Sequence, residues 1–438
     1  MRRRRLTAGI AIGAASVLVL GIVQLVGGSE TDPSPSGTAG SASSSSDPPS
    51  SEPGGEAASS DASDTTDTTD TTGPVAARAV EIAAPKLTPD RAQGEPAASG
   101  DTGLARVQTL GGTSMSPKSV VASSTGVVFA QNMMYRHSVS VFDADGALVR
   151  TIPDSVDLSE HGIAGHPGTT KGAPVEMAFS PDATTAWVSN YSMYGKGFGP
   201  EGKDTCSPGD GTHDSYVYRI DVATDAISKV IKVGAVPKYV AATPDGTRVL
   251  VTNWCTWDLS IIDTSTGSEV KRVPLGGNYP RGIAVSPDSR TAYIALMGSD
   301  RIVSVDLATF AVTPFAAPGD GPRHLVMSPD GTTIFVTNNR TGNIAKIDRA
   351  SGQITGKVAT GMEPRSMTIS RDGQAVYVVN YESATMTKVR TADMKIIQTV
   401  NTDNHPIGIT YEPTKQRVWV ACYGGTVLVF DDSRKLTD

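Results

Sequence analysis

The sequence lacks the residue combinations that most enzymes use for covalent or acid–base catalysis. Its 438 residues include only three cysteines and six histidines. No cysteine has a histidine and an acid arranged around it, and there is no nucleophile–base pair, no pair of carboxylates and no dinucleotide-binding loop. The histidines show no metal-ligand spacing on a regular element. We therefore expect no cofactor and no metal, and we favour a binding protein over an enzyme.

Apolar residues at helical spacing are also missing from the repeated part of the chain, which excludes helical repeats. Short apolar runs recur there instead, each opened by a proline and followed by a turn such as Ser-Pro-Asp. The last four intervals between these prolines are 42 or 43 residues long, and insertions lengthen the first two. A period of about forty with short strands predicts a β-propeller with one four-stranded blade per repeat. The opening prolines are Pro117, Pro174, Pro237, Pro280, Pro322, Pro364 and Pro406.

Seven prolines predict seven blades, but the chain ends before the last blade is complete. Too few residues follow Asp431 for a turn and a fourth strand. The segment 104–110 precedes the first repeat and resembles the fourth strand of other repeats, such as residues 395–400. We expect it to pair in the last blade and to close the ring, which removes the open edges of the sheets. The predicted fold is therefore all-β, a seven-bladed β-propeller over residues 104–438.

The front of the chain lacks the features of a folded domain. Residues 2–5 are four arginines and residues 6–28 carry no charge, which is typical of an export signal. The uncharged run is long enough to span a bilayer. We favour an uncleaved signal-anchor over residues 1–28, with a cleaved signal peptide as the alternative. Residues 29–103 are rich in Ser, Thr, Asp and Pro and predict a disordered linker. The expected location is extracytoplasmic, with the protein anchored to the cell membrane or secreted.

Three phrases in the repeats resemble the YVTN family of β-propeller repeats. They are Phe335-Val-Thr-Asn-Asn339, Val251-Thr-Asn253 and Val376-Tyr-Val-Val-Asn380. The resemblance covers residues 104–438 and implies an extracytoplasmic or surface-associated propeller, which in some members binds a ligand or nucleic acid. Related propellers include lactonases and quinoprotein-like dehydrogenases. The alternative to a binding protein is thus a lactonase-like hydrolase or a quinoprotein-like oxidoreductase acting at the axial channel, with Glu176 and Glu363 as the only acids to nominate.

A positive charge follows the opening proline in five of the seven repeats, where the innermost strands approach the axial channel. In an otherwise neutral domain, such cations would attract an anionic ligand. The alternative is that they are solvated residues at the strand starts. Strict alternation also places Arg281 in phase with Ile283 and Val285, which favours an orientation between blades. Together with two histidines at the channel mouth, the predicted ligand-binding residues are Lys118, Lys238, Arg281, Arg323, His324, Arg365 and His405.

Two insertions, residues 153–173 and 191–214, fall on the face that carries these cations, which marks it as the binding face. Cys206 in the second insertion and Cys255 in the equivalent loop of the next blade should lie side by side, and an exported protein keeps disulfides. We predict a Cys206–Cys255 disulfide and a buried free thiol at Cys422. The expected partner is an anionic small molecule, a glycan or a protein, rather than nucleic acid, bound by a monomeric head.

Overall fold

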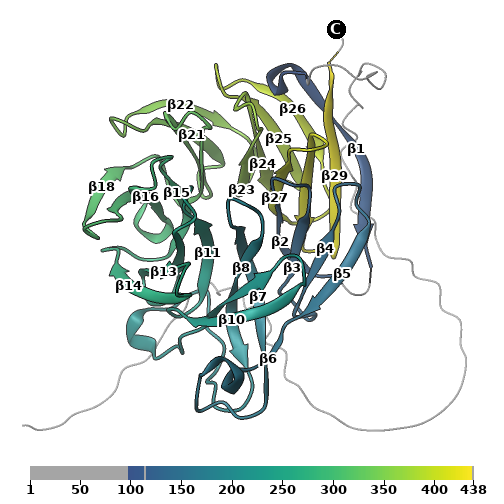
Figure 1. Ribbon diagram of the computed structural model, residues 1–438. Coiled ribbons are helices and arrows are strands. Elements are labelled where there is room, and N and C mark those ends of the chain that lie inside the picture. Colours follow the sequence, from purple (N-terminus) through teal and green to yellow (C-terminus); the bar gives the residue numbers. More distant parts are fainter. Residues whose placement is uncertain (1–96, 113–114, 437–438) are drawn as a thin grey trace, which may run out of the picture. The chain divides into compact units, whose positions relative to one another are not determined.

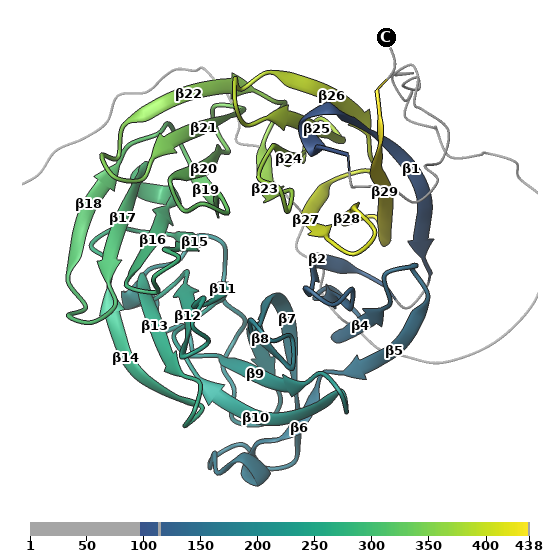
Figure 2. The ribbon, with the colours of Figure 1, turned by 45° about the horizontal axis from the view of Figure 1, so that its top comes forward.

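The described residues, 97–112 and 115–436, form seven β-sheets around a central axis in the computed structural model of the protein (Figure 1). Figure 2 shows the ring that these sheets make. The seven-bladed propeller predicted from the repeats is confirmed. The predicted signal-anchor, residues 1–28, and the predicted linker up to residue 96 lie outside the described residues. Within the described ranges, no helix has the length and apolarity needed to cross a bilayer.

Each blade is an antiparallel sheet whose first strand lies nearest the axis and whose fourth strand lies outermost (Figure 2). Blade 1 contains β2 (Pro117–Ala122), β3 (Val128–Asn132), β4 (Ser138–Phe142) and β5 (Leu148–Pro153). Blade 2 contains β7 (Thr169–Phe179), β8 (Thr185–Tyr194), β9 (Tyr216–Asp221) and β10 (Ala226–Lys232), with the short β6 (Ser155–Asp157) added beside β7. Blade 3 contains β11 (Pro237–Ala242), β12 (Arg248–Asn253), β13 (Asp258–Asp263) and β14 (Ser268–Pro274).

The next blades repeat this order without insertions, as the even spacing of their prolines predicts. Blade 4 contains β15 (Pro280–Val285), β16 (Thr291–Leu296), β17 (Arg301–Asp306) and β18 (Val312–Ala316). Blade 5 contains β19 (Pro322–Met327), β20 (Thr333–Asn338), β21 (Asn343–Asp348) and β22 (Ile354–Ala359). Blade 6 contains β23 (Pro364–Ile369), β24 (Ala375–Asn380), β25 (Thr385–Arg390) and β26 (Ile396–Asn401). Short 3-10 turns lie at η1 (Ser99–Asp101), η2 (Leu158–His161), η3 (Pro208–Asp210) and η4 (Met297–Ser299).

Blade 7 is completed by the first strand of the described chain, as predicted. It contains β27 (Pro406–Glu412), β28 (Arg417–Cys422), β29 (Thr426–Lys435) and β1 (Thr102–Gly111). The strands β1 and β29 pair antiparallel, with Ala105 opposite Asp431 and Gly111 opposite Thr426. The closing strand begins before residue 104, so residues that the sequence analysis assigned to the linker belong to the propeller. Both ends of the folded chain therefore lie in one sheet.

A buried ion pair ties the closing strands to blade 6. Lys388 of β25 and Asp432 of β29 form this pair, and both side chains are 0% exposed. The Lys388 ammonium also donates to the carbonyl and hydroxyl oxygens of Thr102, each at 2.7 Å. Asp432 accepts further hydrogen bonds from the hydroxyls of Thr102, at 3.0 Å, and of Tyr377. All three ammonium protons and both carboxylate oxygens thus have partners, which is the condition for burying such charges.

Every inner strand starts with the same irregularity in its pairing. In β11, Pro237 lies opposite Asn253 and Tyr239 lies opposite Thr252, so the residue between them has no partner of its own. A shift of one residue also follows the opening proline of the other six inner strands, although in β15 and β19 it spans two residues of the inner strand. Such a β-bulge turns the extra side chain out of the regular alternation. The in-phase alternation assumed for Arg281 therefore does not hold across the bulge.

Candidate functional site

The bulged position of five inner strands carries a cation, and the structure brings these five side chains together. We call this set the cation ring; it consists of Lys118, Lys238, Arg281, Arg323 and Arg365. The first four of these residues are only 5–7% exposed. Burial and the charge of Arg281 lower the pKa of Lys118 well below 10.5, and Arg323 and Lys238 lower it further. Burial likewise lowers the pKa of Arg323 well below its usual value, with Arg281 and Arg365 adding to the effect.

Three carboxylates approach the cation ring from different elements. Glu176, on β7, places Oε1 4.0 Å from the Lys118 ammonium. Asp204, in the second insertion, contacts the Lys238 ammonium at 2.9 Å. Glu363, just before β23, contacts the Arg365 guanidinium at 2.7 Å. Five cations thus face three carboxylates. Among the described residues, no carboxylate forms an ion pair with Arg281 or Arg323.

Glu176 is the carboxylate most enclosed by these charges. Burial raises the pKa of Glu176, while the charges of Lys118, Arg281 and Arg323 oppose that rise. The side chain comes from the second residue after Pro174, one position beyond the bulge. Its carboxylate therefore belongs to the layer of side chains next to the cation ring, and not to the ring itself.

Several donors of the cation ring have no acceptor. The Lys118 ammonium is buried and makes no hydrogen bond. In the described part of the chain no residue accepts a hydrogen bond from the Arg281 guanidinium, and the Arg323 guanidinium donates to the backbone carbonyl of Arg365. A buried donor without a partner costs about 1–3 kcal/mol, and more when it is charged. The cation ring therefore contains a buried charged donor, the Lys118 ammonium, that no described residue satisfies.

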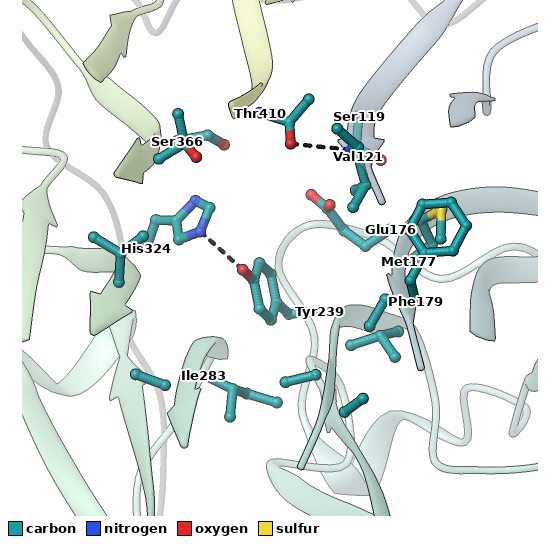
Figure 3. A pocket seen from close by; sticks show the side chains of 18 of the residues that line it. Ser119, Val121, Glu176, Met177, Phe179, Tyr239, Ile283, His324, Ser366 and Thr410 are labelled. Carbon is teal, nitrogen blue, oxygen red and sulfur yellow. Dashed lines mark hydrogen bonds between the residues drawn. The ribbon is translucent and has the colours of Figure 1, made fainter. Parts of the chain in front are cut away.

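The cation ring lies at one end of the axial channel. A cavity of about 510 Å³ runs between residues of all seven inner strands. Its lining begins one position beyond the cation ring, with polar side chains that include Glu176, Tyr239 and His324. These three side chains point toward the middle of the cavity in Figure 3. Aliphatic and aromatic side chains such as Val121 and Phe179 line it further along. A ligand held by the cation ring would therefore meet a polar layer first and an apolar one beneath it.

Tyr239 and His324 form a hydrogen bond across the cavity, at 2.8 Å (Figure 3). Burial lowers the pKa of His324 from 6.5 to about 3, and the charges of Arg323 and Arg281 contribute. The imidazole is thus neutral at physiological pH. Its Nδ1 accepts from the Met367 amide at 3.2 Å, so we assign its proton to Nε2, which donates to the tyrosine oxygen. The hydroxyl proton of Tyr239 is then available to a ligand.

The second insertion packs beside the cation ring, where its residue Asp204 contacts Lys238. The predicted disulfide is confirmed: Cys206 and Cys255 are bonded, with their Cα atoms 5.2 Å apart. Next to this disulfide, the Lys238 ammonium lies over the rings of Tyr191 and Trp254, at 4.6 and 4.9 Å. Such contacts with aromatic faces partly compensate a buried cation. The insertion therefore shapes the surroundings of one ring cation directly.

Aromatic side chains also surround the opposite part of the ring. The Arg365 guanidinium lies 3.4 Å from the centre of the Tyr381 ring. His405 also stacks on Tyr381, with its ring 4.4 Å from that of the tyrosine. Burial raises the pKa of Tyr423 to about 12, although the charges of Arg281, Arg323 and Arg365 act against it. His405 is exposed and has no described contact with the cation ring, whereas His324 lies inside the channel.

Sequence reasoning missed two parts of this site. Tyr239 holds the second position after its proline, like Glu176 and His324, and that shared position is a signal that could have identified it. Asp204 gave no signal beyond its place in an insertion. The predicted free thiol, Cys422, is confirmed as buried, and burial raises its pKa to about 12, so it is unreactive. Among the residues in the described ranges, no three His, Cys, Asp or Glu side chains converge to hold a metal.

Comparisons with known proteins agree with the architecture. The family model described as "Lactonase, 7-bladed beta-propeller" matches residues 210–355, which is less than half of the chain. No curated protein matches the sequence. The solved structure of Kuenenia stuttgartiensis hydrazine synthase is similar, with 18% identity and a TM-score of 0.58, over 74% of this chain and 97% of that one. At this identity the likeness shows the fold alone. The resemblance to YVTN repeats stays a prediction from the sequence.

Proposed function

We propose that this protein binds an anionic ligand at the end of its axial channel, with the cation ring as the recognition element. The observation that carries the proposal is a cluster of buried cations with too few counter-charges: the Lys118 ammonium has no hydrogen-bond acceptor, and no carboxylate of the described residues forms an ion pair with Arg281, which is 6% exposed. Buried charges of one sign are strongly unfavourable unless a counter-charge meets them. With five cations and three carboxylates, the ring has an excess of two positive charges. A small molecule or the end of a glycan with carboxylate, phosphate or sulfate groups would supply the missing acceptors.

We further propose that the protein acts outside the cytoplasm, on a membrane tether formed by residues 1–28. The charge pattern of those residues and the Cys206–Cys255 disulfide support this location, because disulfides persist in oxidising compartments. In such a protein the ligand would come from the medium or from the cell surface. A monomeric head on an extended linker could reach either source.

Titration of the full chain with citrate should show binding that weakens as the sodium chloride concentration is raised. Dissolved salt ions screen the attraction between citrate and the cation ring. Replacing one unpaired cation, Arg281→Ala, should weaken citrate binding by at least about tenfold. The matched control is Arg290→Ala, which removes an exposed arginine from the turn at the other end of the same blade. Calorimetric titration measures both. Equal affinity in the Arg281→Ala variant and the wild type would refute the cation ring as the binding site.

Anion binding should weaken between about pH 7 and pH 9. Burial and the charge of Arg281 lower the pKa of Lys238 to about 8, although Asp204 opposes this. As the pH rises through 8, Lys238 loses its proton and the cation ring loses positive charge. Sulfate is the suitable probe, because its own charge is constant over this range. The Lys238→Arg variant keeps its charge and should bind sulfate with a flatter pH profile. An unchanged profile in this variant would contradict the assignment to Lys238.

A second candidate function is a lactonase-like hydrolase, which the family match over residues 210–355 favours. The site offers Glu176, whose pKa is raised by burial, next to Arg281 and Arg323. A carboxylate in such a position could act as a general base, and neighbouring guanidinium groups could stabilise a developing oxyanion. Turnover of a lactone by the wild-type chain would favour this function over simple binding. We rank it second because the family match covers only residues 210–355, whereas the cation ring comes from five of the seven blades.

A further inference from the structure

We propose that Asp204 is a built-in competitor, whose carboxylate holds one cation of the ring and must be displaced or out-competed by the external anion. This inference rests on the proposed anion-binding function and adds a specificity determinant to it. The observation behind it is the origin of the contact: Asp204 does not belong to the propeller repeat, but to the second insertion, residues 191–214. The insertion thus places a negative charge against the cation ring, whose five members all come from inner strands.

The contact joins an exposed acid to a buried base. Asp204 Oδ1 lies 2.9 Å from Lys238 Nζ, yet the Asp204 side chain is 86% exposed while that of Lys238 is 8% exposed. The Lys238 ammonium is enclosed instead, because it lies over the rings of Tyr191 and Trp254. Asp204 can rotate into solvent, where its carboxylate would be hydrated at little cost. The acid is therefore the movable partner, and the ammonium is the fixed one.

The backbone that carries Asp204 is fixed on both sides. The indole nitrogen of Trp254 donates to the Asp204 carbonyl at 2.8 Å, and the hydroxyl of Tyr191 donates to the Gly202 carbonyl at 2.9 Å. The Cys206–Cys255 disulfide follows immediately in the chain. Side-chain rotation is thus free while the main chain is not. The carboxylate remains close to Lys238 at a high effective concentration, as an intramolecular competitor would.

The field of the ring keeps this competitor charged. The charge of Lys238 lowers the pKa of Asp204, and those of Arg281 and Lys118 contribute in the same direction. Asp204 is therefore an anion at any pH at which an external carboxylate is one. An anion with a single charge gains little by replacing it. A ligand with two or more negative charges can also engage Arg281 and Arg323, which have no carboxylate of their own. The site should thus select multiply charged anions over singly charged ones.

The test compares two variants of the full chain that each remove one negative charge from the same insertion. Asp204→Asn should bind citrate about threefold to tenfold more tightly than the wild type, as expected for loss of a competing exposed charge. Glu201→Gln is the matched control, because Glu201 is exposed and makes no described contact with a ring cation; it should change the affinity by less than about twofold. Acetate binding should gain more from Asp204→Asn than citrate binding does.

The outcomes separate this inference from the proposed function. If the wild type binds citrate and Asp204→Asn binds it equally or more weakly, Asp204 is not a competitor, although the cation ring still binds anions. If neither protein binds citrate, both ideas are refuted. The Cys206→Ser/Cys255→Ser double variant releases the insertion without changing its charge, and it should also bind citrate more tightly. Unchanged affinity in that variant would overturn the role of the fixed backbone.

Discussion

Replacing Lys388 by methionine should lower the free energy of unfolding by about 3–5 kcal/mol, because the substitution leaves a buried carboxylate without its counter-charge. Asp432 is fully buried, and its pKa is already raised by burial, with Lys388 opposing the rise. Without the ammonium, Asp432 must bind a proton or remain an unpaired buried charge. The Thr102 oxygens also lose their donor. Chemical denaturation monitored by fluorescence measures the change.

The neighbouring blade supplies the matched control for this experiment. Lys346 of β21 occupies the same position of its repeat as Lys388 does in β25, but it is half-buried and donates to one carbonyl, that of Thr391, at 2.8 Å. Lys346→Met should therefore cost less than about 1 kcal/mol. The Lys388→Met/Asp432→Leu double variant should recover much of the lost stability, since an apolar pair can replace a buried ion pair. Equal losses of unfolding free energy in Lys388→Met and Lys346→Met would show that the buried pair of Lys388 and Asp432 has no special role in stability.

The second large effect concerns Arg281 and Arg323, which should limit stability while they provide binding. Their replacement by methionine removes two buried charges that no carboxylate neutralises, and methionine fills a similar volume. We expect the Arg281→Met/Arg323→Met double variant to be more stable than the wild type by about 1–3 kcal/mol without ligand. Its citrate affinity should fall by about a hundredfold or more, because truncating a buried charged contact costs several kcal/mol of binding free energy.

The control for this pair is Arg290→Met/Arg371→Met, which removes the same charge from exposed turns at the far end of blades 4 and 6. It should alter neither the unfolding free energy nor the citrate affinity by much more than about 0.5 kcal/mol. Denaturant unfolding and calorimetric titration of the two double variants give all four quantities. A less stable Arg281→Met/Arg323→Met protein would mean that these arginines hold the blades together, and it would remove the main argument for an anion site.

The fold was predictable because the sequence contains seven similar repeats, of which the last lacks a fourth strand. The seven opening prolines predicted the number of blades, and the missing strand after Asp431 pointed to residues 104–110 as its replacement. The Cys206–Cys255 pairing followed from the same reasoning, because equivalent loops of adjacent blades must be neighbours. These inferences depend on connectivity, which the sequence carries directly.

The site was predictable only in part, because its geometry depends on features that no residue pattern encodes. The five ring positions could be named, but alternation alone turned Arg281 the wrong way, since the bulge after each proline was not anticipated. Asp204 reaches the ring through the course of an inserted loop, and loop paths depend on tertiary contacts such as that between Trp254 and Asp204. His405 stacks on Tyr381, a contact that its place in the repeat did not predict.

The bulge that opens each inner strand also has a consequence for how such a protein can evolve. Because the bulged residue takes no place in the ladder, the pairing of the strands does not depend on which side chain stands there. Lysine, arginine, valine and isoleucine all occupy this position here, at Lys118, Arg281, Val175 and Ile407, on the same backbone. The seven inner strands thus present seven such positions around one axis. Substitutions at those positions can therefore change the charge at the end of the channel while the pairing of the strands is inherited unchanged.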